Sequence, residues 1–167
     1  MKMEFKTLGK VPIPNIIEYI KEYLVKYPNV ELLIGCDSQS YGTYRTVYGV
    51  VVVLYEPGHG GHVLCASETL PFEKVRPVRL LSEVWKAIEV AEFLKENKLP
   101  APKWIDIDLN PDPRYDSNSV LRQAVGMVEG MGYHARCKHN GVMATYAANA
   151  LVRQGSRKSK DRKSKVK

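Results

Sequence analysis

The chain lacks the features of a membrane, secreted or disulfide-rich protein. Its longest apolar stretch runs only from Val47 to Tyr55, far short of the roughly 18 residues that cross a bilayer. The first residues contain no apolar segment typical of a signal peptide, so we expect none. The cysteines Cys36, Cys65 and Cys137 are scattered and lack the spacing of metal or redox motifs. We therefore expect reduced thiols and a cytoplasmic protein with no membrane partner.

Net positive charge is nearly absent outside the C-terminal end of the chain. Residues 155–167 contain seven Lys or Arg and one Asp, which accounts for +6 of the net charge of +7. This segment has almost no apolar residues, so we predict a disordered basic tail. Its cations, Arg157, Lys158 and Lys160 among them, either neutralise nucleic-acid phosphates or only keep the chain soluble.

The rest of the chain predicts one α/β domain, residues 30–154, preceded by a helical extension, residues 1–29. Apolar residues recur at helical spacing from about residue 14 to the break at Tyr27-Pro28-Asn29. Strands are then expected where β-branched residues alternate or cluster between turn residues. The expected elements after the first helix are three strands (31–37, 46–55, 62–70), a helix (79–98), a strand (103–109), a helix (117–131), a strand (132–138) and a helix (141–153).

Asp37 follows a run of apolar residues that begins after Glu31. Turn residues on one side and polar residues on the other are typical of a buried strand. An acid at the end of such a strand costs free energy unless it is hydrogen-bonded, paired or bound to a cation. Asp37 is therefore a candidate site residue, and the alternative is that it caps the following turn.

Three further acids occupy positions that need an explanation. Glu83 falls on the apolar, core-facing side of its predicted helix, where the alternative role is a buried hydrogen bond to a hydroxyl or backbone group. Asp108 lies near the C-terminal end of strand 103–109, where ligand sites of α/β sheets gather. Asp106, two residues earlier, lies on the same face of this strand as Asp108. For Asp106 and Asp108 the alternative is the solvent face of an edge strand.

The order of these elements, with several local motifs, resembles the ribonuclease H-like fold and its YkuK-type bacterial family. The resemblance covers about Val30 to Val152. The motifs that carry it are Gly35-Cys36-Asp37-Ser38-Gln39, the Gly58–Gly61 hairpin, Arg79–Glu83, Ile107–Asn110, Ser117-Asn118 and Gly126–Tyr133. It implies an α/β fold with a mixed five-stranded sheet. Three strands form an antiparallel meander, two follow through helical crossovers, and the N-terminal helix is an addition.

The resemblance also implies a nuclease site with two divalent ions, Mg²⁺ or Mn²⁺, bound by hard oxygen ligands. Asp37 would bridge both ions, Glu83 would hold one, and Asp108 would complete the catalytic set. The family carries a fourth acid on the last helix, where this chain has Asn149. An amide oxygen can coordinate a metal but adds no negative charge.

Substrate contacts are implied at two further places. Ser38 and Gln39 follow the first acid directly, and Lys138-His139 falls on the loop before the last helix, where related nucleases contact phosphate. His139 could also shuttle a proton, although the alternative is a loop histidine without a role.

Three functions are compatible with these features. The first is a metal-dependent nuclease acting on RNA, an RNA–DNA hybrid or structured DNA. The second is a nucleic-acid-binding module that has lost turnover and uses the basic tail. The third is a protein-interaction domain with an inactive site. Fold alone does not choose among them, and the sequence leaves the oligomeric state and the role of Asp106 open.

Overall fold

A computed structural model describes residues 3–138 and 144–163, with side chains to residue 153. Its elements, in chain order, are β1 (Phe5–Thr7), β2 (Pro12–Ile13), α1 (Ile16–Lys26), β3 (Glu31–Tyr41), β4 (Arg45–Glu56), β5 (Gly60–Pro71), α2 (Arg76–Glu96), β6 (Trp104–Ile107), the 3₁₀ helix η1 (Asp116–Val120), α3 (Leu121–Gly130), β7 (Ala135–Cys137) and α4 (Ala144–Lys163). No helix in these ranges is long and apolar enough to cross a membrane.

The strands form one mixed sheet in the order β2-β1-β5-β4-β3-β6-β7. β3, β4 and β5 are an antiparallel meander, and β6 and β7 continue it in parallel beside β3. This confirms the predicted antiparallel meander followed by two strands through helical crossovers, whereas the predicted count of five strands is too low. The described sheet has seven strands, because β1 and β2 extend it beyond β5. Strands of two and three residues are too short to show an alternating pattern, so the sequence did not predict them.

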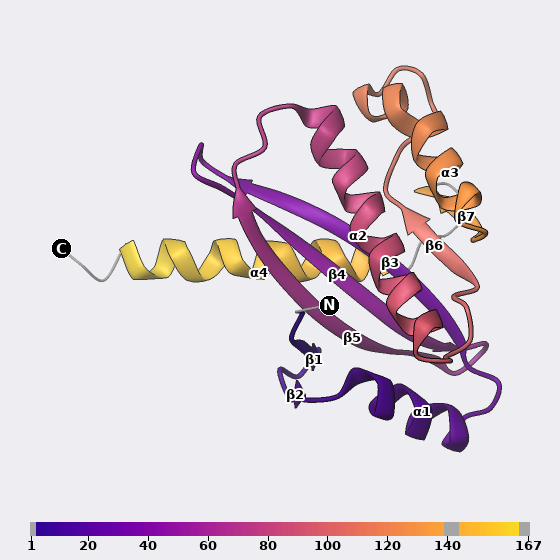
Figure 1. Cartoon of the computed structure of the whole chain (residues 1–167). Helices are drawn as coiled ribbons and strands as arrows, with labels where there is room; N and C mark the ends of the chain where they lie inside the picture. The colour runs from indigo at the N-terminus through magenta and orange to yellow at the C-terminus, as the bar shows by residue number, and fades with distance from the viewer. Residues whose placement is uncertain (1–2, 139–143, 164–167) are drawn as a thin grey trace.

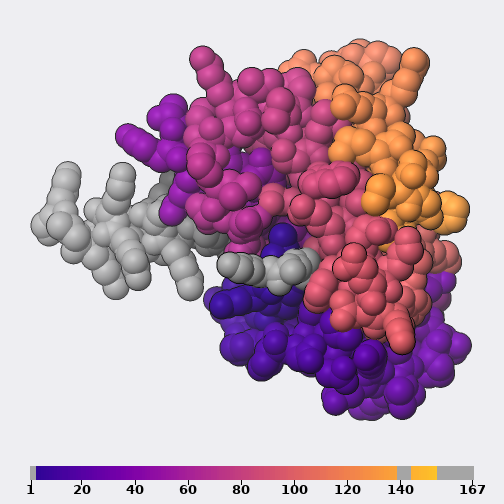
Figure 2. All heavy atoms as spheres, in the orientation of Figure 1, coloured from indigo at the N-terminus to yellow at the C-terminus, as the bar shows by residue number. Residues whose placement is uncertain are grey.

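Helices cover both faces of the sheet (Figure 1). α1, α2 and α3 pack against one face, where Ile34 contributes to the larger core cluster. α4 packs against the other, where Leu33 contributes to the smaller one. Because neighbouring residues of a strand point to opposite faces, the continuous valine run of β4 serves both cores. In the space-filling view, α2 forms much of the visible face between the N-terminal residues below and α3 above (Figure 2).

Glycine allows α4 to lie directly on the central strands. A Cβ atom at Gly35 of β3 would lie 2.8 Å from the backbone nitrogen of Thr145, and one at Gly49 of β4 would lie 2.7 Å from Val152. Any side chain at Gly35 would therefore push α4 away from the sheet. This close contact fixes the start of α4 beside the middle of β3, where β3 pairs with Asp106 of β6.

Two elements are longer than predicted. β3 continues to Tyr41 because its polar second half pairs with β4, so Asp37 faces Gly49 within the ladder and does not cap a turn. α4 continues to Lys163, where we predicted a helix end at Arg153 and a disordered tail from residue 155. The segment contains no proline, and Lys, Arg and Gln are good helix formers. The division of the chain at residues 29–30 and 154–155 stays a prediction.

Candidate active site

The three acids expected to be catalytic come from three different elements and line one pocket. Asp37 lies in β3, Glu83 in α2, and Asp108 directly after β6. The pocket has a volume of about 250 Å³, and we call it the acid pocket. The structure thus brings together residues that are separated by up to 71 positions in the sequence.

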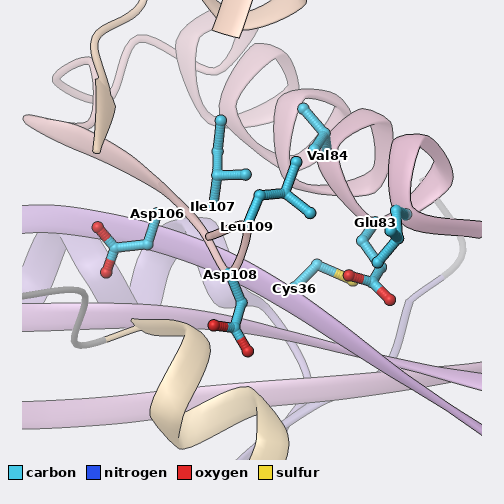
Figure 3. A pocket seen from close by; sticks show the side chains of 8 residues that line it. Cys36, Glu83, Val84, Asp106, Ile107, Asp108 and Leu109 are labelled. Carbon is cyan, nitrogen blue, oxygen red and sulfur yellow. The ribbon is translucent and has the colours of Figure 1, made fainter. Parts of the chain in front are cut away.

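The parallel pairing of β3 with β6 sets the position of two of these acids. Gly35 lies opposite Asp106 in the ladder, so Asp37 and Asp108, each two residues further on, are level with each other. Figure 3 shows that Ile107 points toward α2, whereas Asp108 points away from it, toward α4. Successive side chains of a β-strand point to opposite faces. Ile107 therefore anchors β6 in the core, whereas Asp108 presents its carboxylate on the other side.

Glu83 is almost fully buried and is held by a short chain of hydrogen bonds. The Ser38 hydroxyl donates to Glu83 Oε1 at 2.5 Å, and Arg79 Nη1 donates to Ser38 Oγ at 3.0 Å and to the Ser38 carbonyl oxygen at 3.3 Å. Arg79 precedes Glu83 by one helical turn, so both point to the same side of α2. The hydroxyl contact considered as an alternative role for Glu83 is therefore present.

The electrostatic environment of Glu83 is unfavourable for a carboxylate. Burial, and then the nearby charges of Asp37 and Asp108, raise its pKa from the usual 4.5 to about 8, although the Ser38 hydroxyl and Arg79 oppose this. Burial also raises the pKa of Asp37, with the charge of Asp108 adding to the effect. Burial therefore makes both carboxyl groups harder to ionise than exposed ones.

Asp108 has an incompletely satisfied carboxylate. Its Oδ1 atom is buried and accepts no hydrogen bond from any described residue. Lys138 Nζ lies 3.2 Å from this oxygen, so the two residues form an ion pair without hydrogen-bond geometry. Lys138, which the resemblance implies to be a phosphate contact, is thus placed at the acid pocket beside an acid.

Asp106 has a different environment, and the alternative that it lies on the solvent face of an edge strand is wrong. β7 covers the outer edge of β6, so Asp106 is 2% exposed. Its two oxygens accept from Arg136 Nε at 2.7 Å and Nη2 at 2.9 Å, and Oδ2 also accepts from the backbone N–H of Ala144 at 2.7 Å. Asp106 therefore joins β6, β7 and the start of α4.

The remaining predicted site residues are placed differently. Ser38 lines the acid pocket, whereas the Gln39 side chain donates to the Ser40 carbonyl oxygen in its own strand. Asn149 is half-buried on α4 and is not among the residues that line the acid pocket. His139 lies outside the described residues, as do the side chains of Arg157, Lys158 and Lys160.

Sequence reasoning did not predict several residues that line the acid pocket, among them Arg79, Arg76 and Tyr115. Arg79 could have been found from its spacing of four residues before Glu83 on a predicted helix. Arg76, which donates to exposed Asp116 at 3.3 Å, and Tyr115 enter the acid pocket from the start of α2 and from the loop before η1. Neither stands at a position with a recognisable sequence pattern.

The donor set of the acid pocket suits a divalent cation. Three carboxylates provide hard oxygen ligands, one oxygen of Asp108 is buried without a hydrogen bond, and Glu83 needs positive charge nearby to ionise. Their spacing is less favourable, since no group of three or more His, Cys, Asp or Glu within residues 3–138 and 144–153 could hold a metal ion. Two of the three acids also have other partners, because Ser38 hydrogen-bonds Glu83 and Lys138 pairs with Asp108.

The sheet order, the crossover helices and the acids at adjoining strand positions define a ribonuclease H-like domain. A family model described as Ribonuclease H-like matches residues 14–153, so the chain belongs to the ribonuclease H-like family. This confirms the resemblance to its YkuK-type branch. Domains of this family generally bind nucleic acid and typically depend on divalent metals. A search of curated proteins found no match.

Proposed function

We propose that this protein is a metal-dependent nuclease that hydrolyses phosphodiester bonds of RNA, an RNA–DNA hybrid or structured DNA. The observation that carries this proposal is the convergence of Asp37, Glu83 and Asp108 in one pocket that also contains Arg79 and Lys138. Carboxylates suit a metal-assisted attack by water, and cations beside them suit the phosphate on which that attack occurs.

Each residue has a distinct task in this proposal. Two Mg²⁺ or Mn²⁺ ions, when bound, would activate a water molecule and stabilise the departing oxygen. Asp37, Glu83 and Asp108 would hold the ions, and Asn149 of α4, which does not line the acid pocket, would be the neutral ligand that the resemblance implies. Ser38 and Arg79 orient Glu83 through the hydrogen bonds described above.

Substitution of Asp37 tests the proposal. Asp37→Asn keeps the shape of the side chain but removes its charge, so it should abolish Mn²⁺-dependent cleavage in a screen of RNA, hybrid and branched DNA substrates. The control is Glu22→Gln, because Glu22 is an exposed acid of α1 that does not line the acid pocket. Cleavage by Asp37→Asn at the rate of the unmodified protein would refute the proposal.

A second candidate function is a nucleic-acid-binding module without turnover. It is favoured by the spacing of the acids, which do not form a ready metal-binding group in the described ranges, and by Asn149 in place of a fourth acid. Here affinity would come mainly from the basic C-terminal residues. Deletion of residues 156–167 should then lower both the affinity and its salt dependence, and an unchanged salt slope would count against this function.

We also place the protein in the cytoplasm. Its three cysteines are free thiols, and two of them, Cys36 and Cys65, are buried in the core. Burial raises the pKa of both thiols, which keeps them protonated and unreactive. These properties suit a reducing compartment.

A further inference from the structure

The cations around the acid pocket differ in how firmly they are held. Arg79 is fixed, because one of its nitrogens donates to both the hydroxyl and the carbonyl oxygen of Ser38. Lys86, one turn after Glu83 on α2, is also fixed: it is buried, pairs with Glu68 and lies 5.1 Å from the centre of the Tyr48 ring. Both cations are parts of the folded framework.

Lys138 is held differently. Its side chain is 40% exposed, and its ammonium contacts the Asp108 carboxylate at 3.2 Å without forming a directed hydrogen bond. A lysine is a compact charge on a flexible stem, so it can leave such a contact with little rearrangement. Arg76 also lines the acid pocket and is exposed, but it pairs with the exposed Asp116. Lys138 is therefore the partly exposed, pocket-lining cation whose partner is one of the three acids.

The position of Lys138 matters because Asp108 Oδ1 is buried and accepts no hydrogen bond. A single positive charge there reduces the repulsion among Asp108, Asp37 and Glu83 but provides no coordination. A divalent cation carries twice the charge, and it can accept oxygen ligands from more than one of the acids. Lysine and metal would thus compete for the same carboxylate.

We propose that Lys138 is a displaceable internal counterion of the acid pocket, occupying at Asp108 the position that a divalent cation takes. This inference rests on the proposed metal-dependent function, and it describes how metal binding in the acid pocket is regulated. The lysine stabilises the metal-free acid pocket, and it also raises the concentration of metal at which the acid pocket fills. The counterion role of Lys138 accounts for two observations: Asp108 is paired, and the three acids do not form a metal-binding group among the described residues.

Calorimetric titration of Mn²⁺, without nucleic acid, into the full chain and its Lys138→Met variant tests the inference. Removing the competing charge should tighten Mn²⁺ binding about fivefold, the size expected for a half-exposed ion pair. The control is Lys103→Met. Lys103 is similarly exposed and pairs with Glu31 at 2.5 Å, away from the acid pocket, so its removal should leave Mn²⁺ affinity unchanged.

Thermal melting in a chelator gives a second readout that does not need bound metal. Lys138→Met should melt at a lower temperature than the unmodified protein in chelator, and saturating Mn²⁺ should remove the difference. Lys138→Arg keeps the charge and should behave like the unmodified protein in both assays.

The outcomes separate the two proposals. Equal Mn²⁺ affinity for the unmodified protein and Lys138→Met, with binding clearly measured in both, would overturn the counterion role and leave the nuclease proposal standing. Failure of both proteins to bind Mn²⁺ would overturn the metal-dependent function and the counterion role with it. Circular dichroism of each variant establishes that a changed affinity does not come from loss of the fold.

Discussion

The buried carboxyl group of Glu83 should make the stability of the metal-free protein depend on pH. Burial, followed by the charges of Asp37 and Asp108, raises its pKa from the usual 4.5 to about 8. A folded-state pKa above the unfolded value means that the folded state binds the proton more tightly. The contribution to stability is therefore complete below about pH 4.5 and is lost as the pH rises through about 8.

The magnitude follows from linkage. Between the two pKa values, each pH unit costs about 1.4 kcal/mol of unfolding free energy. From about pH 5.5 to pH 8, the protein should therefore lose about 3 kcal/mol through Glu83 alone. Glu83→Gln cannot ionise and should not show this loss. The difference between the two proteins isolates Glu83 from every other group that titrates in this range.

The assay is denaturant unfolding at several pH values in the presence of a chelator, with the unmodified protein and Glu83→Gln measured side by side. The control is Glu22→Gln, because Glu22 is an exposed glutamate of α1. Its pH profile should match that of the unmodified protein. Parallel pH profiles for the unmodified protein and Glu83→Gln would refute the reasoning. Saturating Mn²⁺ should flatten the unmodified profile, because a bound cation favours the ionised carboxylate.

Three other perturbations follow from the contacts. Ser38→Ala should cost about 1–3 kcal/mol of unfolding free energy, because it removes the partner of a buried carboxyl group. Arg136→Met should cost about 3–5 kcal/mol, since it leaves Asp106 buried without its paired charge. Gly35→Ala should destabilise the protein by at least about 2 kcal/mol in the same assay, whereas Gly126→Ala, which meets nothing within 4 Å, should not. A destabilisation of less than about 0.5 kcal/mol in any of the first three variants would contradict the corresponding contact.

The sequence predicts those parts of the fold whose patterns are long. The valine run of β4, the helical spacing of α2 and the turn residues between strands were sufficient for the order of these elements along the chain. The resemblance to the ribonuclease H-like fold supplied the order of the central strands in the sheet. β1 forms because β5 offers an edge with which it can pair, and β2 pairs in turn with β1. The sequence of residues 5–13 carries no sign of that edge. β3 likewise extends to Tyr41 because β4 provides partners for its polar half.

The acid pocket shows a similar division. Asp37, Glu83 and Asp108 could be singled out because each is an acid in an apolar setting, and the structure places all three in one pocket. Arg76 and Arg79 could not be singled out, since an arginine at a helix start resembles any surface residue, and Lys138 was predicted only through the resemblance to the family. Their importance at Arg79 and Lys138 comes from the carboxyl and hydroxyl groups that the fold places beside them.

Asp106 and Asp108 show why pairing, and not sequence position, distinguishes a structural acid from a candidate catalytic one. They stand two residues apart on the same face of one strand and its extension. Asp106 accepts two hydrogen bonds from Arg136 and one from the first N–H of α4, so its charge is fully compensated. Among the described residues, Asp108 pairs only with the partly exposed Lys138, and its charge contributes to the raised pKa of Asp37 and Glu83. The fold therefore neutralises one acid to fix β7 and α4, and leaves the next one available for a cation.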